Sequence, residues 1–500
     1  IWLQKFFLSR LDFMPIEYLI FLTVFTPVLV GGLNLIFHKT ANIRDSVTLL
    51  GALITFYFSV NIFLRFDGQV TQYKFLTIMP GIDISFHIEP LGIIFSLLAS
   101  SLWILTHIYA IGYMRGAKEK NHSRFFLFFS VSIASVMGIS FSGNLFTLFL
   151  FYELLTLITF PLVSHKGSSE ALRGARVYLS ILLGTSIGLQ LLGIIWIYFS
   201  VGTLDFVKGG ILDGSFGPFE LIILVGLFAF GIGKAALFPF HRWLPAAMVA
   251  PTPVSALLHA VAVVKAGVFT VLKVGVYIFG VESLSVSGAT DWLTWLACFS
   301  ILFASLIAMT KDNLKARLAY STISQLAYVV LAFSLANSLG VLGGALQIIT
   351  HAFGKITLFM CAGSIYVATK KTNISDMQGL GRVMPITFLS FLVGAISIIG
   401  LPPMGGSWAK WFLIMSSLEA DKQFVIIVLL ISSLLNIAYL LPLVAKGFYL
   451  NPADQKEVKH FKEPSAFIWL PPAITASVSL LLFFYVDYIR DFMINFGLVG

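Results

Sequence analysis

The sequence predicts an all-α integral membrane protein of about fourteen transmembrane helices, built from two inverted five-helix repeats and a small external β-hairpin. Three observations support this fold class: the composition, the recurrence of long apolar segments, and the placement of charges and helix breakers. Of the 500 residues, 58% are hydrophobic and only 11% are charged, whereas soluble domains carry about 25% charged residues. The mean hydropathy of +0.94 agrees with a chain that lies mostly in lipid.

Apolar segments of about 20 residues or more recur along nearly the whole chain, and this length crosses a bilayer core of about 30 Å. The predicted spans are 17–37, 46–64, 90–112, 123–141, 143–164, 174–200, 218–240, 253–279, 290–308, 315–336, 340–369, 386–419, 424–448 and 467–486.

Lysine and arginine residues alternate between the loops and predict the orientation of these spans. Loops after the even-numbered spans contain only Arg65, Lys74, Lys208 and Lys422. Loops after the odd-numbered spans contain Lys39, Arg44, Arg115, Lys118, Lys120, Arg124, Lys166, Arg173, Arg176, Arg242, Lys311, Lys315, Arg317, Lys370, Lys371, Arg382, Lys456, Lys459 and Lys462. The positive-inside rule therefore predicts cytoplasmic basic loops and two external termini in a cell (inner or plasma) membrane. The net charge of +9 is explained by topology, so no nucleic acid is expected as a partner.

One external loop has strand character. In IDISFHI (82–88), apolar and polar residues alternate strictly, Pro80-Gly81 precedes them as a turn, and QYKFLTI could form the second strand. The stretch near 70–90 predicts a β-hairpin, with an irregular loop as the alternative.

The sequence offers no readable redox, metal or cofactor site. Cys298 and Cys361 lie far apart in apolar runs, and two cysteines cannot hold an iron–sulfur cluster, which needs about four thiolates. GIGK (231–234) resembles part of a phosphate-binding loop but lacks the required spacing. No cofactor and no metal are therefore expected.

Charged residues inside the apolar spans carry the functional prediction, because each costs at least about 2.5–3.5 kcal/mol at the centre of a membrane helix. A lone lysine is often a snorkelling residue, and Lys273 and Lys446, closer to helix ends, are interpreted in this way. The set near the midplane spreads over five spans and is harder to explain structurally: Glu153, Lys234, His259, Lys265, His351, Lys355 and Lys410.

Such a set fits proton movement. Burial in a low dielectric disfavours the charged form of a lysine, and a nearby carboxylate restores it. A Glu–Lys pair that closes and opens can therefore load and release a proton, and histidine relays protons near neutral pH. Glu153 and Lys234 are the candidate pair, Lys265 and Lys410 are further translocating residues, and the expected relays are His241, His259, His351 and Lys355.

Two spans are interrupted beside a lysine. Pro239 removes a helical hydrogen bond to the carbonyl of Ala235, just after Lys234, and a Pro/Gly cluster precedes Lys410. Irregular backbone in a membrane is tolerated only inside protein or beside water. Two broken helices five spans apart predict an inverted repeat. The predicted organisation is helices 1–3 with the hairpin (1–122), helices 4–8 (123–279), helices 9–13 (290–448), and a cytoplasmic loop with helix 14 (449–500).

The motifs around these residues resemble the proton-translocating antiporter-like membrane subunits of respiratory complex I, Mrp Na+/H+ antiporters (D-type subunit) and membrane-bound hydrogenases. The resemblance is carried by FPFHRWLPAAMVAPTPVSALLHAVAVVKAG (238–267), RLAYSTISQLAY (317–328), THAFGKITLFMCAGSIY (350–366) and GLPPMGGSWAKWFL (400–413). It covers roughly residues 90–450.

The resemblance implies fourteen transmembrane helices, two inverted five-helix repeats and broken seventh and twelfth helices. It also implies that Glu153 and Lys234 form the ion pair of the first half-channel, and that Lys265 connects the two halves. His351 and Lys355 match the polar pair of the central axis, and Lys410 the charged residue of the second half-channel. Some members carry Glu at this last position, so lysine favours the Mrp D-type or hydrogenase-type subunits.

The expected function is translocation of H+, or exchange of H+ for Na+, by one subunit of a multisubunit membrane complex. No catalytic or redox site is expected in this chain, so redox chemistry would belong to partner subunits, and further antiporter-like subunits are expected beside it. Two alternatives stay open: a stand-alone secondary transporter of a small solute, and a membrane scaffold that does not pump.

Overall fold

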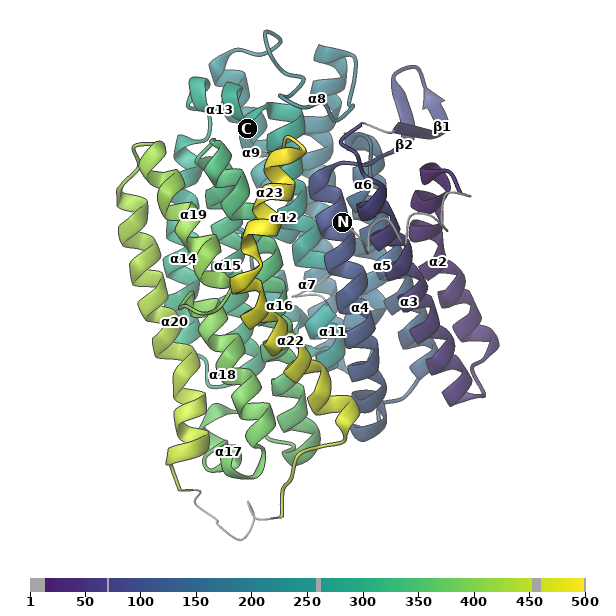
Figure 1. The fold of residues 1–500 in the computed structure, drawn as a ribbon, viewed down its shortest axis with the longest axis vertical. Coiled ribbons are helices and arrows are strands. Elements are labelled where there is room, and N and C mark those ends of the chain that lie inside the picture. Colours follow the sequence, from purple (N-terminus) through teal and green to yellow (C-terminus); the bar gives the residue numbers. More distant parts are fainter. Residues whose placement is uncertain (1–13, 70–71, 258–261, 452–459, 499–500) are drawn as a thin grey trace.

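The computed structural model describes residues 14–69, 72–257, 262–451 and 460–498, and helices dominate these ranges (Figure 1). Each of the fourteen predicted spans coincides with a helix or an interrupted helix. The α-helices are α2 (Ile16–Ile36), α3 (Ala41–Arg65), α4 (Pro90–Gly116), α5 (His122–Ser140), α6 (Leu145–Val163), α7 (Ser169–Thr185), α8 (Leu191–Val201), α9 (Pro218–Gly231), α10 (Trp243–Ala246), α11 (Thr252–Ala256), α12 (Val263–Val274), α13 (Val281–Ser287), α14 (Asp291–Thr310), α15 (Leu314–Ser334), α16 (Ser338–Thr369), α17 (Leu380–Val383), α18 (Pro385–Ile399), α19 (Gly406–Glu419), α20 (Phe424–Tyr449), α22 (Ala466–Phe484) and α23 (Val486–Asn495). Short 3-10 or π segments are η1 (Ser186–Gln190), η2 (Gly233–Ala235), η3 (Ala247–Val249), η5 (Gly275–Phe279) and η6 (Ile374–Asp376).

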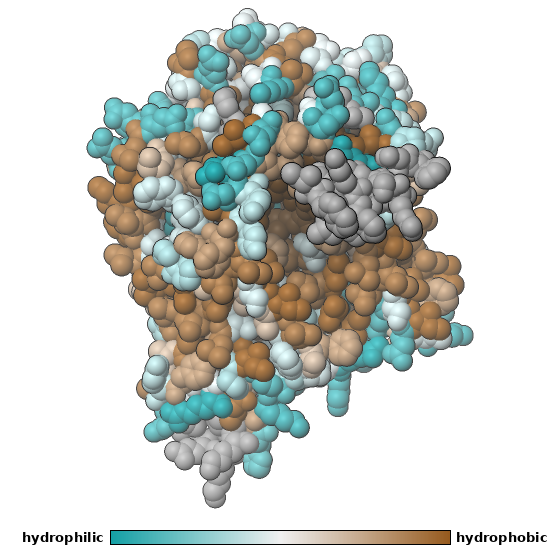
Figure 2. Space-filling view, viewed as in Figure 1, coloured by the Kyte–Doolittle hydropathy of each residue, from teal (hydrophilic) through white to brown (hydrophobic). Residues whose placement is uncertain are grey.

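Ten helices in the described part of the chain are long and apolar enough to cross a membrane, or eleven if the bent pair Val263–Phe279 and Val281–Ser287 counts as one span. The other predicted spans fall short for two reasons. Breaks leave α9 and α18 at only 14 and 15 residues, and the first half of α15 is rich in polar residues. Figure 2 shows apolar side chains across the middle of the visible face and hydrophilic side chains toward both ends, as a membrane-spanning protein requires.

The predicted hairpin is present. Strands β1 (Gln72–Met79) and β2 (Ile82–His87) pair antiparallel, and Gly81 adopts a positive φ of 76° between them. The hairpin lies at one end of the molecule, together with the loop after α8, and α17 lies at the opposite end (Figure 1). We call the first end the hairpin face. Ser85, Phe86 and His87 at the end of β2 are buried, because the main chain there bonds to Phe141 and Gly143.

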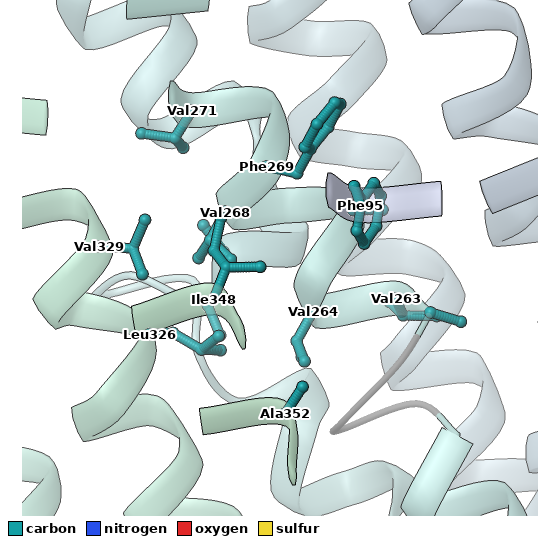
Figure 3. Close-up of a cluster of buried hydrophobic side chains, with 14 of the residues drawn as sticks. Phe95, Val263, Val264, Val268, Phe269, Val271, Leu326, Val329, Ile348 and Ala352 are labelled. Carbon is teal, nitrogen blue, oxygen red and sulfur yellow. The ribbon is translucent and has the colours of Figure 1, made fainter. Parts of the chain in front are cut away.

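Helix α16 lies at the centre of the fold, and 94% of its most apolar window is buried. Apolar side chains of α4, α12, α15 and α16 meet around it (Figure 3), and Phe95 stacks on Phe269 with ring centroids 4.5 Å apart. Every residue of α12 is buried. Charged side chains on α12 and α16 are therefore enclosed by protein and not by lipid, which limits them to partners that other helices supply.

Candidate functional site

The interruption of the seventh span begins before Lys234, earlier than its proline suggested. Helix α9 ends at Gly231, and Lys234 lies in the single turn η2. A Cβ on Gly231 would lie 2.4 Å from the main-chain nitrogen of Gln190, in the π-segment η1. The close approach of η1 therefore explains why a glycine is needed where α9 ends. Pro239 lies eight residues further on, so it is not the residue that ends α9.

Backbone groups freed at this break find partners. The Lys234 N–H donates to the Tyr152 hydroxyl at 3.1 Å, and the Trp243 indole N–H donates to the Gly233 carbonyl at 2.9 Å. A non-helical segment at this depth survives because side chains of other elements replace the missing helical bonds. The break is thus built into the packing of α6 and α10.

The Lys234 ammonium group is fully buried against α6. Its Nζ donates to the Tyr152 carbonyl at 2.8 Å and to Thr156 Oγ1 at 2.5 Å, and it lies 3.1 Å from the centre of the Tyr152 ring. A carbonyl, a hydroxyl and an aromatic face supply dipoles that stabilise a cation without neutralising it.

Glu153 follows Tyr152 on α6 and is near enough to Lys234 for a favourable charge–charge interaction. Among the described residues the two form no direct ion pair, and both carboxylate oxygens of Glu153 are buried without a hydrogen-bond partner. The structure thus brings the predicted acid and lysine into one site but leaves them separated. Burying a carboxylate without a partner costs free energy. A hydrogen-bond donor or a cation that approaches Glu153 would therefore stabilise it.

Lys265 and His351 are joined directly, with Lys265 Nζ 2.6 Å from His351 Nδ1. Both side chains are buried, on α12 and α16. Helix α12 begins at Val263, so Lys265 lies in its first turn. His259, the neighbouring relay candidate, lies outside the described residues.

Lys355, one turn after His351 on α16, donates from Nζ to Ser321 Oγ at 2.5 Å. The Tyr439 hydroxyl lies 2.8 Å from the same Ser321 oxygen and also contacts Asn436 Oδ1. These residues come from α15, α16 and α20, so a buried polar connection runs from the central helix into the second half. The sequence predicted Lys355 but gave no sign of Ser321, Asn436 and Tyr439.

Lys410 lies just after the break between α18 and α19. Its Nζ donates to the Ile399 carbonyl at 2.7 Å and to Ser433 Oγ at 2.8 Å, and it lies 5.2 Å from the centre of the Tyr328 ring. Gly400 has a positive φ of 83°, and a Cβ there would lie 2.5 Å from Lys410 Cδ. The glycine thus both ends α18 and leaves room for the lysine.

His241, the remaining relay candidate, lies after the seventh-span break and is largely buried. Its ring stacks on Phe238 with centroids 5.4 Å apart, and its Nδ1 has no hydrogen-bond partner among the described residues. The His241 imidazole therefore lies beside the break, but among the described residues no hydrogen bond links this imidazole to Lys234.

The buried ion pair between Lys273 and Glu89 was missed by sequence reasoning. Lys273 does not snorkel, because its side chain is fully buried and its Nζ lies 3.2 Å from Glu89 Oε1. The correction has a simple cause: α12 is enclosed by protein, so a lysine near its end cannot reach a membrane surface. A signal for the start of α4 was present, since Pro90 at the start of an apolar run is typical of the first position of a helix, but nothing local linked Glu89 to Lys273.

The fold and these contacts define a multi-pass membrane protein in which two broken helices each present a buried lysine. The family described as NADH:quinone oxidoreductase/Mrp antiporter, TM matches residues 142–436, and the family described as NADH-Ubiquinone oxidoreductase (complex I), chain 5 N-terminus matches residues 78–126. The chain belongs to the NADH:quinone oxidoreductase/Mrp antiporter family and is an antiporter-like membrane subunit.

Individual relatives agree with this assignment. NADH-quinone oxidoreductase subunit N of Desulforudis audaxviator (strain MP104C) is 31% identical over 385 residues, covering 76% of each chain. NAD(P)H-quinone oxidoreductase chain 5 of Synechocystis sp. is 33% identical over 352 residues, covering 66% of this chain and 49% of that protein.

Solved structures show the same fold. A chain of the membrane-bound sulfane sulfur reductase, an archaeal respiratory membrane complex, aligns with a TM-score of 0.84 at 22% identity, covering 96% of this chain and 97% of that one. A chain of the Mrp complex from Dietzia sp. DQ12-45-1b aligns with a TM-score of 0.79 at 21% identity, covering 96% of each.

Proposed function

We propose that this chain translocates protons across a cell membrane as one subunit of a larger complex, using buried lysines as its proton carriers. The observation that carries the proposal is the state of four lysines in the described part of the chain. None has a carboxylate within ion-pair distance, all are nine-tenths buried or more, and each is held by carbonyl, hydroxyl or imidazole groups. They are Lys234, Lys265, Lys355 and Lys410.

A buried ammonium without a counter-ion is expensive, because neutral dipoles compensate only part of the lost hydration. Such a lysine changes its proton occupancy when a charge or a water molecule approaches. Glu153 is the group that could approach Lys234: closing the distance between them stabilises the protonated lysine, and opening it favours release. Neighbouring lysines repel one another when charged, so release at one site eases loading at the next.

The proposed route has two halves joined at α12 and α16. The first repeat (123–279) holds Glu153 and Lys234, and the second (290–448) holds Lys355 and Lys410. The Lys265–His351 contact links them. His241, and His259 with it, would relay protons between Lys234 and water. With basic loops in the cytoplasm, the hairpin face and both termini would be external.

Partner subunits would supply the driving force. The relatives are named as subunits of quinone oxidoreductases, and the structural neighbours come from membrane complexes. We infer that this chain also sits beside other membrane subunits, further antiporter-like chains and redox subunits among them. Protons are the ions that we propose to be translocated, and in an exchange mode Na+ would move in the opposite direction.

The test is replacement of Lys234 by alanine in the intact complex, with proton and Na+ movement measured in sealed membrane vesicles. We expect translocation to be abolished while assembly is retained. Lys74→Ala is the matched control, because Lys74 is an exposed lysine on β1. Normal transport in Lys234→Ala would refute the mechanism, and solute uptake that survives without the partner subunits would favour a stand-alone transporter.

A further inference from the structure

A cavity of about 770 Å3 opens beneath the hairpin face, and the mechanism above does not use it. Its walls come from the segment after α3, both strands of the hairpin, the start of α4, the loops after α5 and α8, the segment η5 and the chain at the end of α23. Acid, base and hydroxyl groups line it, among them His87, Glu89, Asp205, Lys208 and Tyr277. We call it the vestibule.

The inner wall of the vestibule carries the Glu89 carboxylate, which accepts four hydrogen bonds. The donors are the N–H groups of Leu91 at 2.7 Å and Gly92 at 2.8 Å, the Tyr277 hydroxyl at 2.8 Å and the Lys273 ammonium at 3.2 Å. Glu89 thus caps α4, where the helix dipole favours a negative charge.

Lys273 lies directly behind this carboxylate, fully buried. Its Nζ also lies 2.9 Å from the Ser142 carbonyl and 3.3 Å from the Ser140 carbonyl at the end of α5. The C-terminal end of a helix favours a positive charge. The pair is therefore held between the start of one helix and the end of another, and the ammonium keeps carbonyl partners if Glu89 becomes protonated.

A second buried group, His87, lies close enough to this pair to interact with both of its charges. It lines the cavity two residues before Glu89, it is only 6% exposed, and its Nε2 has no hydrogen-bond partner among the described residues. Burial and, second, the charge of Lys273 lower the pKa of His87, Glu89 opposes them, and the net value is about 4. The neutral form of this imidazole is therefore favoured, so that it can accept a proton only transiently.

We infer that the vestibule is the proton-release site of the hairpin face, with the Glu89–Lys273 pair as its inner group and His87 as its outer group. In this scheme a proton arriving from Lys265, eight residues before Lys273 and about 12 Å along α12, is accepted by Glu89. It passes to His87 Nε2 and then to vestibule water, which restores the carboxylate and the neutral imidazole. This inference rests on the proposed proton translocation.

The test uses the intact complex in sealed vesicles, with pH varied on the hairpin face and clamped on the other. In the wild type, acidifying the hairpin face should slow translocation. His87→Gln and Glu89→Gln should lower the rate and lose this one-sided pH response, while the response to pH on the other face remains. Asp213→Asn is the matched control: Asp213 is an exposed acid in the loop after α8 that does not line the vestibule, and this variant should behave as the wild type.

Wild-type rates and one-sided pH response in both variants would overturn the inference. A lowered rate with an unchanged pH response would also overturn it, because a purely structural pair predicts that result. Glu89 caps α4, so Glu89→Gln could prevent assembly. In that case the result for His87→Gln alone tests the inference, because His87 caps no helix. Failure of the proposed function is separate: there Lys234→Ala would still translocate protons, whatever the vestibule variants do.

Discussion

Lys234 and Lys410 occupy similar surroundings in the two halves of the molecule. Each lies at a helix break, donates to one main-chain carbonyl and one side-chain hydroxyl, and faces a tyrosine ring. The first uses Tyr152 and Thr156 of α6, and the second uses Ile399 of α18, Ser433 of α20 and Tyr328 of α15. The difference is the acid: Glu153 lies on α6, whereas α15 contains no Asp or Glu.

This asymmetry separates two ways of controlling a buried lysine. In the first half a carboxylate can approach or withdraw, so the charge of Lys234 responds to a movement of α6 or η2. In the second half the described contacts of Lys410 are a carbonyl, a hydroxyl and an aromatic ring, so its charge responds to hydration and to the other lysines. The first half is therefore the natural place for a conformational input, and the second half follows it electrostatically.

The largest expected effect tests what the two lysines share. Lys234→Arg and Lys410→Arg keep a positive charge but cannot release a proton, because arginine stays charged in proteins. We expect both variants to assemble and to lose proton translocation, measured in sealed vesicles with a pH-sensitive dye. Lys446→Arg, near the end of α20, is the control and should pump normally. Pumping by either of the first two variants would mean that fixed charge suffices.

The second prediction tests what the two halves do not share. Glu153→Gln removes the acid of the first half and leaves the second half unchanged. We expect translocation to slow by about 5- to 150-fold, because a charge–charge interaction of about 1–3 kcal/mol is lost. Glu170→Gln, an exposed acid at the start of α7, is the control. A wild-type rate in Glu153→Gln would show that Lys234, like Lys410, is controlled by dipoles alone.

Local patterns were enough to find the spans, the hairpin and most of the buried charges. A lysine in an apolar run is visible without any tertiary information, because the cost of burying it is a property of the residue itself. The same holds for the alternation in IDISFHI, which identifies strand β2. The spans, the hairpin and the buried lysines of both halves could therefore be predicted from the sequence.

Partners and break positions were not predictable, because distant segments decide them. Glu89 and Lys273 are 184 residues apart, and Lys265 and His351 are 86 residues apart. Gly231 ends α9 because η1 packs against it, and no local rule connects that glycine to Gln190. Packing also keeps Glu153 and Lys234 apart. The family resemblance implied an ion pair between these two residues, and it could not predict that they are separated in this structure.

A smaller effect is expected from the polar connection of the second half. Tyr439→Phe removes the hydroxyl that lies 2.8 Å from Ser321 Oγ, next to Lys355. One buried hydrogen bond is worth about 1 kcal/mol, so translocation should slow about fivefold. Tyr449→Phe, at the exposed end of α20, is the control. An unchanged rate in Tyr439→Phe would show that Lys410 does not depend on this connection.

The smallest effect concerns acid stability and again separates the halves. His165, after α6, is buried with Nε2 3.0 Å from the Lys120 carbonyl, whereas the matching loop after α15 carries the neutral Asn337. Burial, with Arg124 second, lowers the pKa of His165 to about 4, below its unfolded value of about 6.5. A lowered histidine pKa means that its stabilising contribution is complete above pH 6.5 and is lost as pH falls toward 4.

Hydrogen exchange, corrected for its intrinsic pH dependence, is the measurement for this prediction. Between pH 7 and 4.5 the segment 145–201 should lose protection before the segment 314–334, because α6 is followed by a buried histidine, whereas α15 contains no histidine. His165→Gln should reduce that difference, since glutamine carries no charge at either pH. Equal loss of protection in both segments of the wild type would show that the two halves respond to acid as one unit, with no separate weak point in the first.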